Sequence, residues 1–211
     1  MTVAVLAPRR RARPHYRTVK RVLDLVLCLL AMPLVVPVAI AVAVAIRLDS
    51  PGPVVFTQPR TGRNGQRFRM YKFRTMVRNA EELKAGLAHL STVPPPDFKI
   101  PDDPRITRVG HFLRRTSLDE LSQLLNVIRG EMSLVGPRPT SFASSTYRLW
   151  HTQRLEATPG ITGLWQVTDC HQSTFDERLR LDVEYMDNMS LMTDLRILWR
   201  TVSSVVRRSG A

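Results

Sequence analysis

Hydrophobic positions form one long run near the start of the chain and short periodic segments after it. Residues 25–46 carry no charged side chain. A helix over them would be about 33 Å long, which matches a bilayer core of about 30 Å. Pro33 and Pro37 lie inside this run, and each removes a backbone donor and crowds the preceding turn. The pattern therefore predicts a membrane helix that is broken or bent in its middle.

The charges around the run bear on its topology. Basic residues precede it, and basic residues outnumber acids after it. Because positive flanks favour the cytoplasm, we predict a re-entrant helix-break-helix over residues 20–47, with its break at Pro33 and Pro37. A spanning helix stays open, since kinked spanning helices are tolerated. A cleaved signal peptide fits less well, because the run is longer than the apolar core of such peptides.

The remaining pattern predicts a compact domain over residues 48–211. Residues 54–57 and 68–75 are rich in β-formers and flank a Gly62…Asn64-Gly65 turn, which predicts a β-hairpin. Residues 79–90 are a short helix candidate, and apolar stripes at helical spacing predict helices over residues 117–129 and 192–206. The predicted class is α+β, a mostly helical cytosolic domain with a small hairpin, anchored by the re-entrant helix. Residues 1–19 are predicted to be a disordered basic arm beside anionic lipid.

The charge balance indicates a phosphate-bearing partner. The 211 residues include 31 Lys and Arg against 18 Asp and Glu, a formal net charge of +13. Such an excess suits an anionic membrane surface, a phosphorylated substrate or nucleic acid. Aromatic residues make up only 7% and no nucleic-acid-binding module is recognisable, so no nucleic-acid partner is expected. A membrane-tethered module that binds anionic lipid or nucleic acid is kept as an alternative. Cys28 lies inside the apolar run, so no disulfide with Cys170 is expected, which favours a reducing compartment.

An acidic pair follows two arginines at the start of the predicted 117–129 helix. Ser117-x-x-Glu120 has the spacing of a capping box, which would explain both residues without any function. The same position also suits a bound diphosphate, because a helix amino terminus favours anions and Arg114 and Arg115 could clamp phosphate oxygens. In that second interpretation Asp119 could attack phosphorus as a nucleophile.

Other basic residues are placed by pattern alone. Lys72 and Arg74 share one parity on the second strand of the predicted hairpin. An exposed, solvated face is the simplest interpretation of that pair. Arg138 lies in Gly136-Pro137-Arg138-Pro139, a turn in which a glycine and two prolines would fix the direction of one arginine.

These segments, taken together and in order, carry a family resemblance. The chain resembles the bacterial sugar transferase family, the monotopic phosphoglycosyl transferases that initiate capsule, exopolysaccharide, O-antigen and glycoprotein glycan synthesis, from about Lys20 to Arg208. The matching motifs are Lys20-Arg21-x-x-Asp24, Ser50-Pro51-Gly52-Pro53-Val54, Tyr71-Lys72-Phe73-Arg74-Thr75-Met76, Asp103-Pro104-Arg105-Ile106-Thr107, Arg114-Arg115-Thr116-Ser117-Leu118-Asp119-Glu120-Leu121, Asn126-Val127, Met132-Ser133-Leu134-Val135-Gly136-Pro137-Arg138-Pro139, Pro159-Gly160-Ile161-Thr162-Gly163, Leu181-Asp182-x-x-Tyr185 and Asp194-Leu195.

The resemblance implies a reaction and its residues. It implies transfer of a phosphosugar from a UDP-sugar to a polyprenyl phosphate, expected to be undecaprenyl phosphate, with release of UMP through a covalent intermediate on Asp119. Glu120 would hold Mg²⁺ with Asp119 or activate the acceptor phosphate. The expected location is the bacterial inner membrane, with the catalytic domain on its cytoplasmic face. The implied phosphate or uridine contacts are Lys72, Arg74, Arg114, Arg115 and Arg138.

One segment departs from the family pattern. Trp165-Gln166-Val167 is followed by Thr168-Asp169-Cys170, where the family usually has a Ser/Asn-Gly-Arg turn. The change keeps open a second alternative, a catalytically degenerate scaffold that binds the donor. The sugar, the length of the polyprenyl chain and the oligomeric state stay open, with a homodimer as one possibility.

Overall fold

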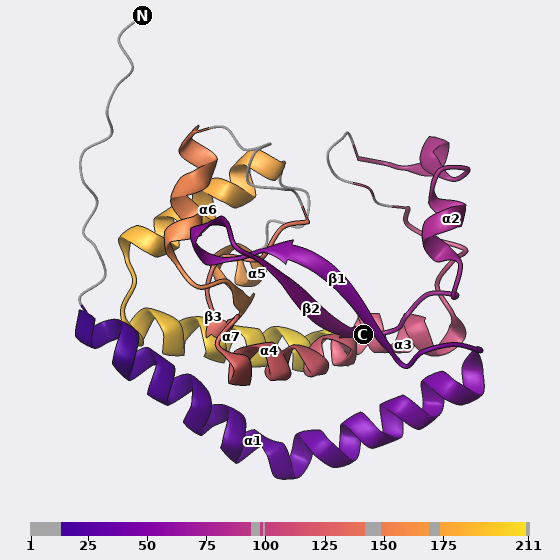
Figure 1. Cartoon of the computed structure of the whole chain (residues 1–211), viewed down its shortest axis with the longest axis horizontal. Helices are drawn as coiled ribbons and strands as arrows, with labels where there is room; N and C mark the ends of the chain where they lie inside the picture. Colours follow the sequence, from indigo (N-terminus) through magenta and orange to yellow (C-terminus); the bar gives the residue numbers. More distant parts are fainter. Residues whose placement is uncertain (1–13, 94–97, 99, 142–148, 169–173, 210–211) are drawn as a thin grey trace, which may run out of the picture.

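The computed structural model describes residues 14–93, 98, 100–141, 149–168 and 174–209. These residues form a mostly helical protein with two small two-stranded sheets (Figure 1). This agrees with the predicted α+β class. In chain order the elements are α1 (Pro14–Asp49), β1 (Val55–Thr61), η1 (Arg63–Gly65), β2 (Arg67–Phe73), α2 (Ala80–Lys84), η2 (Ala88–Leu90), α3 (Arg108–Thr116), η3 (Leu118–Gln123), α4 (Leu124–Arg129), β3 (Ser133–Val135), η5 (Leu149–Glu156), β4 (Gly160–Thr162), α5 (Leu164–Val167), α6 (Phe175–Asp187) and α7 (Leu191–Ser209).

Helix α1 is long, apolar and bent in its middle, so that it curves around one side of the domain (Figure 1). Pro33 and Pro37 lie inside it, as expected for a kink at proline. The predicted helix-break-helix is therefore corrected to one kinked helix. The predicted disordered arm also needs correction, because α1 begins at Pro14 and residues 14–19 are helical; residues 1–13 lie outside the described residues. By length and composition α1 could cross a membrane.

Both ends of α1 are fastened to the domain by polar contacts. At its start, the Tyr16 hydroxyl and the Lys20 ammonium each donate to Oδ2 of Asp194 on α7 over 2.8 Å. At its end, Oδ2 of Asp49 accepts from the backbone N–H of Val109 on α3 over 3.2 Å. The two ends of the helix therefore lie on the same body.

Pro33 and Pro37 divide α1 into a first arm before them and a second arm after them. Each arm buries one apolar side against the domain. Cys28, a free thiol, joins a cluster with Met70 and Val127. Val42 and Ile46 join a second cluster with Phe73 and Leu113, against which Leu118 and Leu121 of η3 also pack. Large apolar side chains around the bend stay exposed, including Leu29, Leu30, Leu34 and Ile40.

The predicted hairpin is confirmed. β1 and β2 pair antiparallel, with Val55 opposite Phe73 and Thr61 opposite Arg67. Their connection turns through Asn64 and Gly65, which both have positive φ, a conformation that these two residue types tolerate better than most. The hairpin presents Lys72 near the end of β2.

The helix predictions meet mixed outcomes. The 79–90 segment contains only the short elements α2 and η2, and the 117–129 helix is divided into η3 and α4. Residues 192–206 lie within α7. The apolar stripe of α7 is exposed at Met192, Leu195, Trp199 and Val202, while Asp194 and Ile197 are buried. α3 was not predicted.

Candidate active site

The acidic pair is positioned by the junction between α3 and η3. Thr107 caps the start of α3, its hydroxyl oxygen accepting from the Gly110 N–H over 3.0 Å. Gly110 also allows α3 to approach the segment that follows β2, because a Cβ there would lie 2.0 Å from the Thr75 carbonyl oxygen. α3 ends at Thr116 and is capped by Ser117, whose φ of 58° changes the direction of the chain before η3. Asp119 then falls in the first turn of η3.

This geometry corrects the capping-box interpretation. Ser117 makes no side-chain capping bond and instead occupies the left-handed C-cap of α3. Glu120 is engaged elsewhere, because its Oε1 lies 2.8 Å from Lys72 Nζ and 2.7 Å from Arg138 Nη2. These two charge-assisted contacts stabilise the Glu120 carboxylate more than the single backbone N–H of a capping box would.

Glu120 is held as an anion. Burial alone would raise the pKa of Glu120, but the charges of Arg138 and Lys72, with their hydrogen bonds, hold that pKa well below its ordinary value. In turn, the Glu120 carboxylate raises the pKa of Arg138. The three residues therefore form a fixed ionic cluster.

Asp119 has the opposite environment. Its residue is 9% exposed, and burial raises the pKa of Asp119, with the neighbouring Glu120 adding to that effect while Lys72 and Arg114 oppose it. The contact between its Oδ2 and Lys72 Nζ is longer, at 3.6 Å. The two adjacent carboxylates therefore differ: Glu120 is held by two cations, whereas Asp119 is desolvated and has one longer contact. Such differentiated titratable pairs are typical of catalytic sites.

The position of Arg138 opposite Glu120 depends on a close approach between the chain after β3 and the chain at β4. β3 and β4 pair parallel, and just beyond β3 a Cβ on Gly136 would lie 2.4 Å from the Thr158 carbonyl oxygen. A Cβ on Gly160 would lie 2.1 Å from the Gly136 nitrogen. Only glycines allow this approach, from which the chain turns into Arg138. The carbonyl of Arg138 then accepts from the guanidinium of Arg154.

The other predicted phosphate ligands take different places. Arg74 is 6% exposed, and its Nη2 and Nη1 donate to the carbonyls of Ser50 (2.7 Å) and Pro51 (2.5 Å). These contacts fasten the loop after α1 and favour a structural role. Arg114 Nε donates to Thr75 Oγ1 over 2.9 Å, and its charge reaches Asp119. Arg115 is exposed on α3. Phosphate binding by these three arginines stays a prediction.

A cavity beyond Arg138 was missed by sequence reasoning. It encloses about 280 Å³ and brings together side chains from β1, α2, η5, α5 and α6. We call it the arginine–aromatic cavity. Its basic residues are Arg60, Lys84, Arg138, Arg154 and Arg178, and its aromatic residues are Phe98, Trp165 and Phe175. Arg138, Trp165 and Asp182 stand in separate motifs quoted above, but nothing in the sequence indicated that these motifs meet. The divergent Asp169-Cys170 lies outside the described residues.

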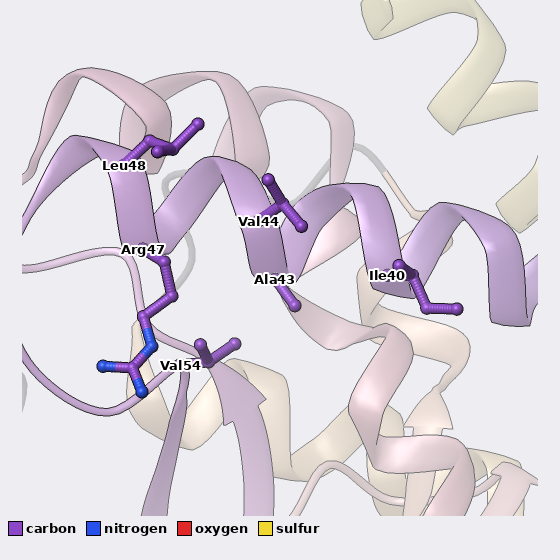
Figure 2. A pocket seen from close by; sticks show the side chains of 6 residues that line it. All are labelled: Ile40, Ala43, Val44, Arg47, Leu48 and Val54. Carbon is purple, nitrogen blue, oxygen red and sulfur yellow. The ribbon is translucent and has the colours of Figure 1, made fainter.

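An apolar groove lies on the second arm of α1. Ile40, Ala43, Val44 and Leu48 line it from the helix, and Val54 lines it from the start of the hairpin (Figure 2). At one end the Arg47 side chain extends from the helix toward the loop below (Figure 2), where its Nη1 donates to the Gly52 carbonyl over 3.1 Å. We call this the α1 groove.

The predicted metal was tested against the ligands present. Among the described residues, no group of three or more His, Cys, Asp or Glu side chains could hold a metal ion. Asp119 and Glu120 supply two carboxylates, and Mg²⁺ is commonly held by one or two carboxylates together with substrate phosphates and water. The pair fits such a partial site, completed by a bound diphosphate.

Comparison with known proteins places the chain in context. The model of a family described as bacterial sugar transferase matches residues 15–208. The chain is 40% identical over 205 residues to the undecaprenyl-phosphate galactose phosphotransferase of Salmonella typhimurium, covering 95% of this chain and 43% of that protein. It is 40% identical over 201 residues to the UDP-glucose:undecaprenyl-phosphate glucose-1-phosphate transferase of Caulobacter vibrioides, covering 91% and 71% respectively.

The length of the match differs among relatives. The exopolysaccharide production protein ExoY of Sinorhizobium fredii is 35% identical over 206 residues, covering 94% of this chain and 90% of that protein. The chain spans less than half the length of several others, among them the Salmonella protein.

Proposed function

Because the chain belongs to the bacterial sugar transferase family, we propose that it transfers a phosphosugar from a UDP-sugar to a polyprenyl phosphate and releases UMP. The observation that carries this proposal is the differentiated acidic pair, with Glu120 locked by Lys72 and Arg138 beside the desolvated Asp119. Two relatives are named for undecaprenyl-phosphate as acceptor, one for galactose and one for glucose. We place the reaction at the first membrane step of a surface glycan pathway.

The chemistry proceeds in two displacements at one phosphorus atom. An Asp119 carboxylate oxygen attacks the β-phosphorus of the donor, the bond to the bridging oxygen breaks, and UMP leaves with that oxygen. A phosphate oxygen of the acceptor then attacks the same phosphorus and frees Asp119, giving a polyprenyl diphosphate sugar. Lys72 and Arg138 offset the negative charge of the diphosphate. Positioning and such electrostatic stabilisation supply most of the catalysis in phosphoryl transfer.

Mg²⁺ belongs to the same proposal. Asp119 and Glu120 would hold the ion together with the donor diphosphate, and the ion would supply further neutralisation of phosphate charge. Glu120 Oε1 is already used by Lys72 and Arg138, so these two cations keep that carboxylate in place whether or not the metal is bound.

We also propose that α1 is re-entrant and enters the inner membrane from its cytoplasmic face. Support comes from its two ends, which both contact the domain through Asp194 and Asp49, and from the exposed apolar side chains around its bend. A straight helix of 36 residues would separate its ends by about 54 Å. The basic charge of the chain and the exposed stripe of α7 would meet the anionic surface of the same leaflet.

We assign the α1 groove to the hydrocarbon chain of the acceptor. Its lining is apolar apart from Arg47, whose charge complements a lipid phosphate. The same arm of α1 contributes Val42 and Ile46 to the cluster that contains Leu118 and Leu121, the neighbours of the acidic pair. A chain bound in the groove would therefore bring its phosphate toward Asp119.

The reaction is tested by UMP release in nanodiscs with Mg²⁺, undecaprenyl phosphate, and UDP-glucose or UDP-galactose. We expect release with one donor. Without acceptor, intact-mass measurement should detect a phosphosugar adduct that maps to Asp119. Asp119→Asn should abolish both signals, whereas Asp102→Asn, at an exposed aspartate outside the site, should leave both unchanged.

Two outcomes would contradict this proposal. Full UMP release by Asp119→Asn would remove Asp119 as nucleophile. Folded wild-type protein that binds UDP-sugar but never releases UMP would instead identify a donor-binding scaffold.

A further inference from the structure

A buried ion pair beside the arginine–aromatic cavity joins Arg154 of η5 to Asp182 of α6. Arg154 Nη2 lies 2.6 Å from Asp182 Oδ2, and the two side chains are only 5% and 2% exposed. Removing two charges from water is costly, so apolar side chains of similar size are often at least as stable in such a place. Stability alone is therefore a weak explanation for this pair, and its other contacts bear on what it does.

Those other contacts go to the backbone of Arg138. The nitrogen of Arg154 that meets Asp182, Nη2, also donates to the Arg138 carbonyl. Burial raises the pKa of Asp182, while the charge of Arg154 and a hydrogen bond from the Arg138 backbone N–H oppose that rise. One member of the pair therefore holds the carbonyl of Arg138, and the other holds its N–H.

Arg138 stands where the chain leaves the backbone pairing between β3 and β4. The residue before it is still paired, because the Pro137 carbonyl accepts from the Gly160 N–H over 2.9 Å. The residue after it is Pro139, which has no N–H to donate. The Arg154–Asp182 pair therefore holds the peptide groups of Arg138 at the point where the sheet no longer does.

The side chain of Arg138 depends on this support. Its Nη2 lies 2.7 Å from Glu120 Oε1, beside Asp119. A guanidinium meets a carboxylate in a fixed planar geometry, so a shift of the Arg138 backbone would move its side chain away from Glu120. In catalytic sites a misplacement of about 1 Å can lower the rate by about 100-fold.

We propose that Arg154 and Asp182 are positioning residues of the transfer reaction. Their ion pair fixes the backbone of Arg138, so that the Arg138 guanidinium is held against Glu120 and faces the diphosphate of the donor. The pair acts through Arg138 and not on the reacting atoms. This inference rests on the proposed function for the reaction that Arg138 supports.

The first experiment replaces the ion pair by apolar side chains, Arg154→Met with Asp182→Leu, in the full chain in nanodiscs. We expect a Tm close to or above that of wild type, but a kcat for UMP release that is lower by about 100-fold. Asp182→Asn keeps the shape and one acceptor oxygen, so it should lower kcat less than the apolar variant does. It replaces the apolar variant in both experiments if the latter does not fold.

A second buried ion pair of the chain supplies the matched control. Arg105 Nη2 lies 2.6 Å from Asp103 Oδ2, with side chains 5% and 6% exposed, and Arg105 Nη1 donates to the Ala80 carbonyl at the start of α2. This pair has the same chemistry and burial but holds a different segment. Asp103→Leu with Arg105→Met should therefore leave kcat for UMP release unchanged.

The second experiment asks whether the pair acts through Arg138. In the wild-type background, Arg138→Ala should lower Tm, because Glu120 loses a buried cation, and should lower kcat. In the Arg154→Met, Asp182→Leu background, Arg138 no longer meets Glu120, so both effects of Arg138→Ala should be smaller. Such non-additivity is expected of residues that act as one unit and not of independent structural contacts.

The outcomes separate this inference from the proposed function. An unchanged kcat in the folded apolar variant, an equal loss in the Asp103 and Arg105 control, or additive effects of Arg138→Ala overturn the positioning role while the proposed function stands. If wild-type protein releases no UMP, the proposed function fails. The Tm comparison needs no turnover, so it then decides alone whether the pair holds Arg138 against Glu120.

Discussion

At the scale of single residues, Lys72 is the cation shared by both acids. Its Nζ lies 2.8 Å from Glu120 and 3.6 Å from Asp119. We expect Lys72→Ala to lower kcat/KM for UMP release by about 100-fold, as for loss of one preorganised charge-stabilising group. Arg69→Ala, at an exposed position of opposite parity on β2, is the control. A loss below about tenfold in folded Lys72→Ala protein would contradict a role at the diphosphate.

Asp182 gives a prediction about pH. Burial raises the pKa of Asp182 from 3.8 to about 6, although the charge of Arg154 opposes the shift. The folded state then holds this proton more tightly than the unfolded state, so the stabilisation is full below about pH 4 and is lost as pH rises to about 6.

Asp182→Asn removes this titration. We expect the Tm of the variant minus that of wild type to increase from about pH 4 to about pH 6 and to level off above. Loss of the ion pair with Arg154 adds a separate offset, so the slope is the diagnostic quantity. A flat or falling difference across that window would show that the pKa of Asp182 is not raised.

Sequence patterns predict the placement of residues whose partners are close in the sequence. They do not predict the partners of residues whose contacts come from distant segments. Asp119 and Glu120 stand in a contiguous string, so their adjacency was certain. Lys72 and Arg74 looked equivalent by parity, yet one meets Glu120 and the other meets the loop at Ser50. That difference arises because Arg74 lies just past the end of β2, beside the segment that follows α1. The alternation of residues along a strand cannot indicate this neighbour.

At the scale of elements, the α1 groove is testable by filling it. Val44 is 53% exposed and lines the groove, so Val44→Trp should occupy its volume. We expect the KM for undecaprenyl phosphate to rise by about tenfold or more, because even one methylene group in a hydrophobic pocket is worth roughly 1–3 kcal/mol, and we expect an unchanged KM for the UDP-sugar. Leu30→Trp, on the first arm and 71% exposed, is the control. Equal effects of both variants would show that the groove does not hold the acceptor.

Elements were predicted well where periodicity was undisturbed. The hairpin and α7 follow it. By contrast, Ser117 caps the end of α3, so the chain changes direction where the sequence pattern predicts the start of one amphipathic helix. Ser117-x-x-Glu120 imitates a capping box, but the site draws Glu120 to Lys72 and Arg138. Tertiary ion pairs replaced the local hydrogen bond that the spacing implied.

At the scale of the whole molecule, the arrangement of α1 predicts which residues share one side of the membrane. We expect single cysteines at Arg17 and Pro53, both exposed, to react with an impermeant thiol reagent from the cytoplasmic side only. A cysteine at Leu34 should be protected by lipid. The measurement uses inverted and right-side-out vesicles, with Cys28→Ala and Cys170→Ala as background. Reaction of the two end positions from opposite sides would establish a spanning helix.

The fastening of α1 also sets an order of events during synthesis. Tyr16 and its partner Asp194 are 178 residues apart, and Asp194 also accepts from the buried Tyr185 over 2.7 Å. Ribosomes add about 5–20 residues per second, so Asp194 is synthesised roughly 10 to 35 seconds after Tyr16. During this interval the apolar helix can enter lipid while its polar anchor does not yet exist. In the proposed re-entrant arrangement, insertion of α1 into the bilayer therefore precedes tertiary closure, and translation of α7 completes the attachment of α1.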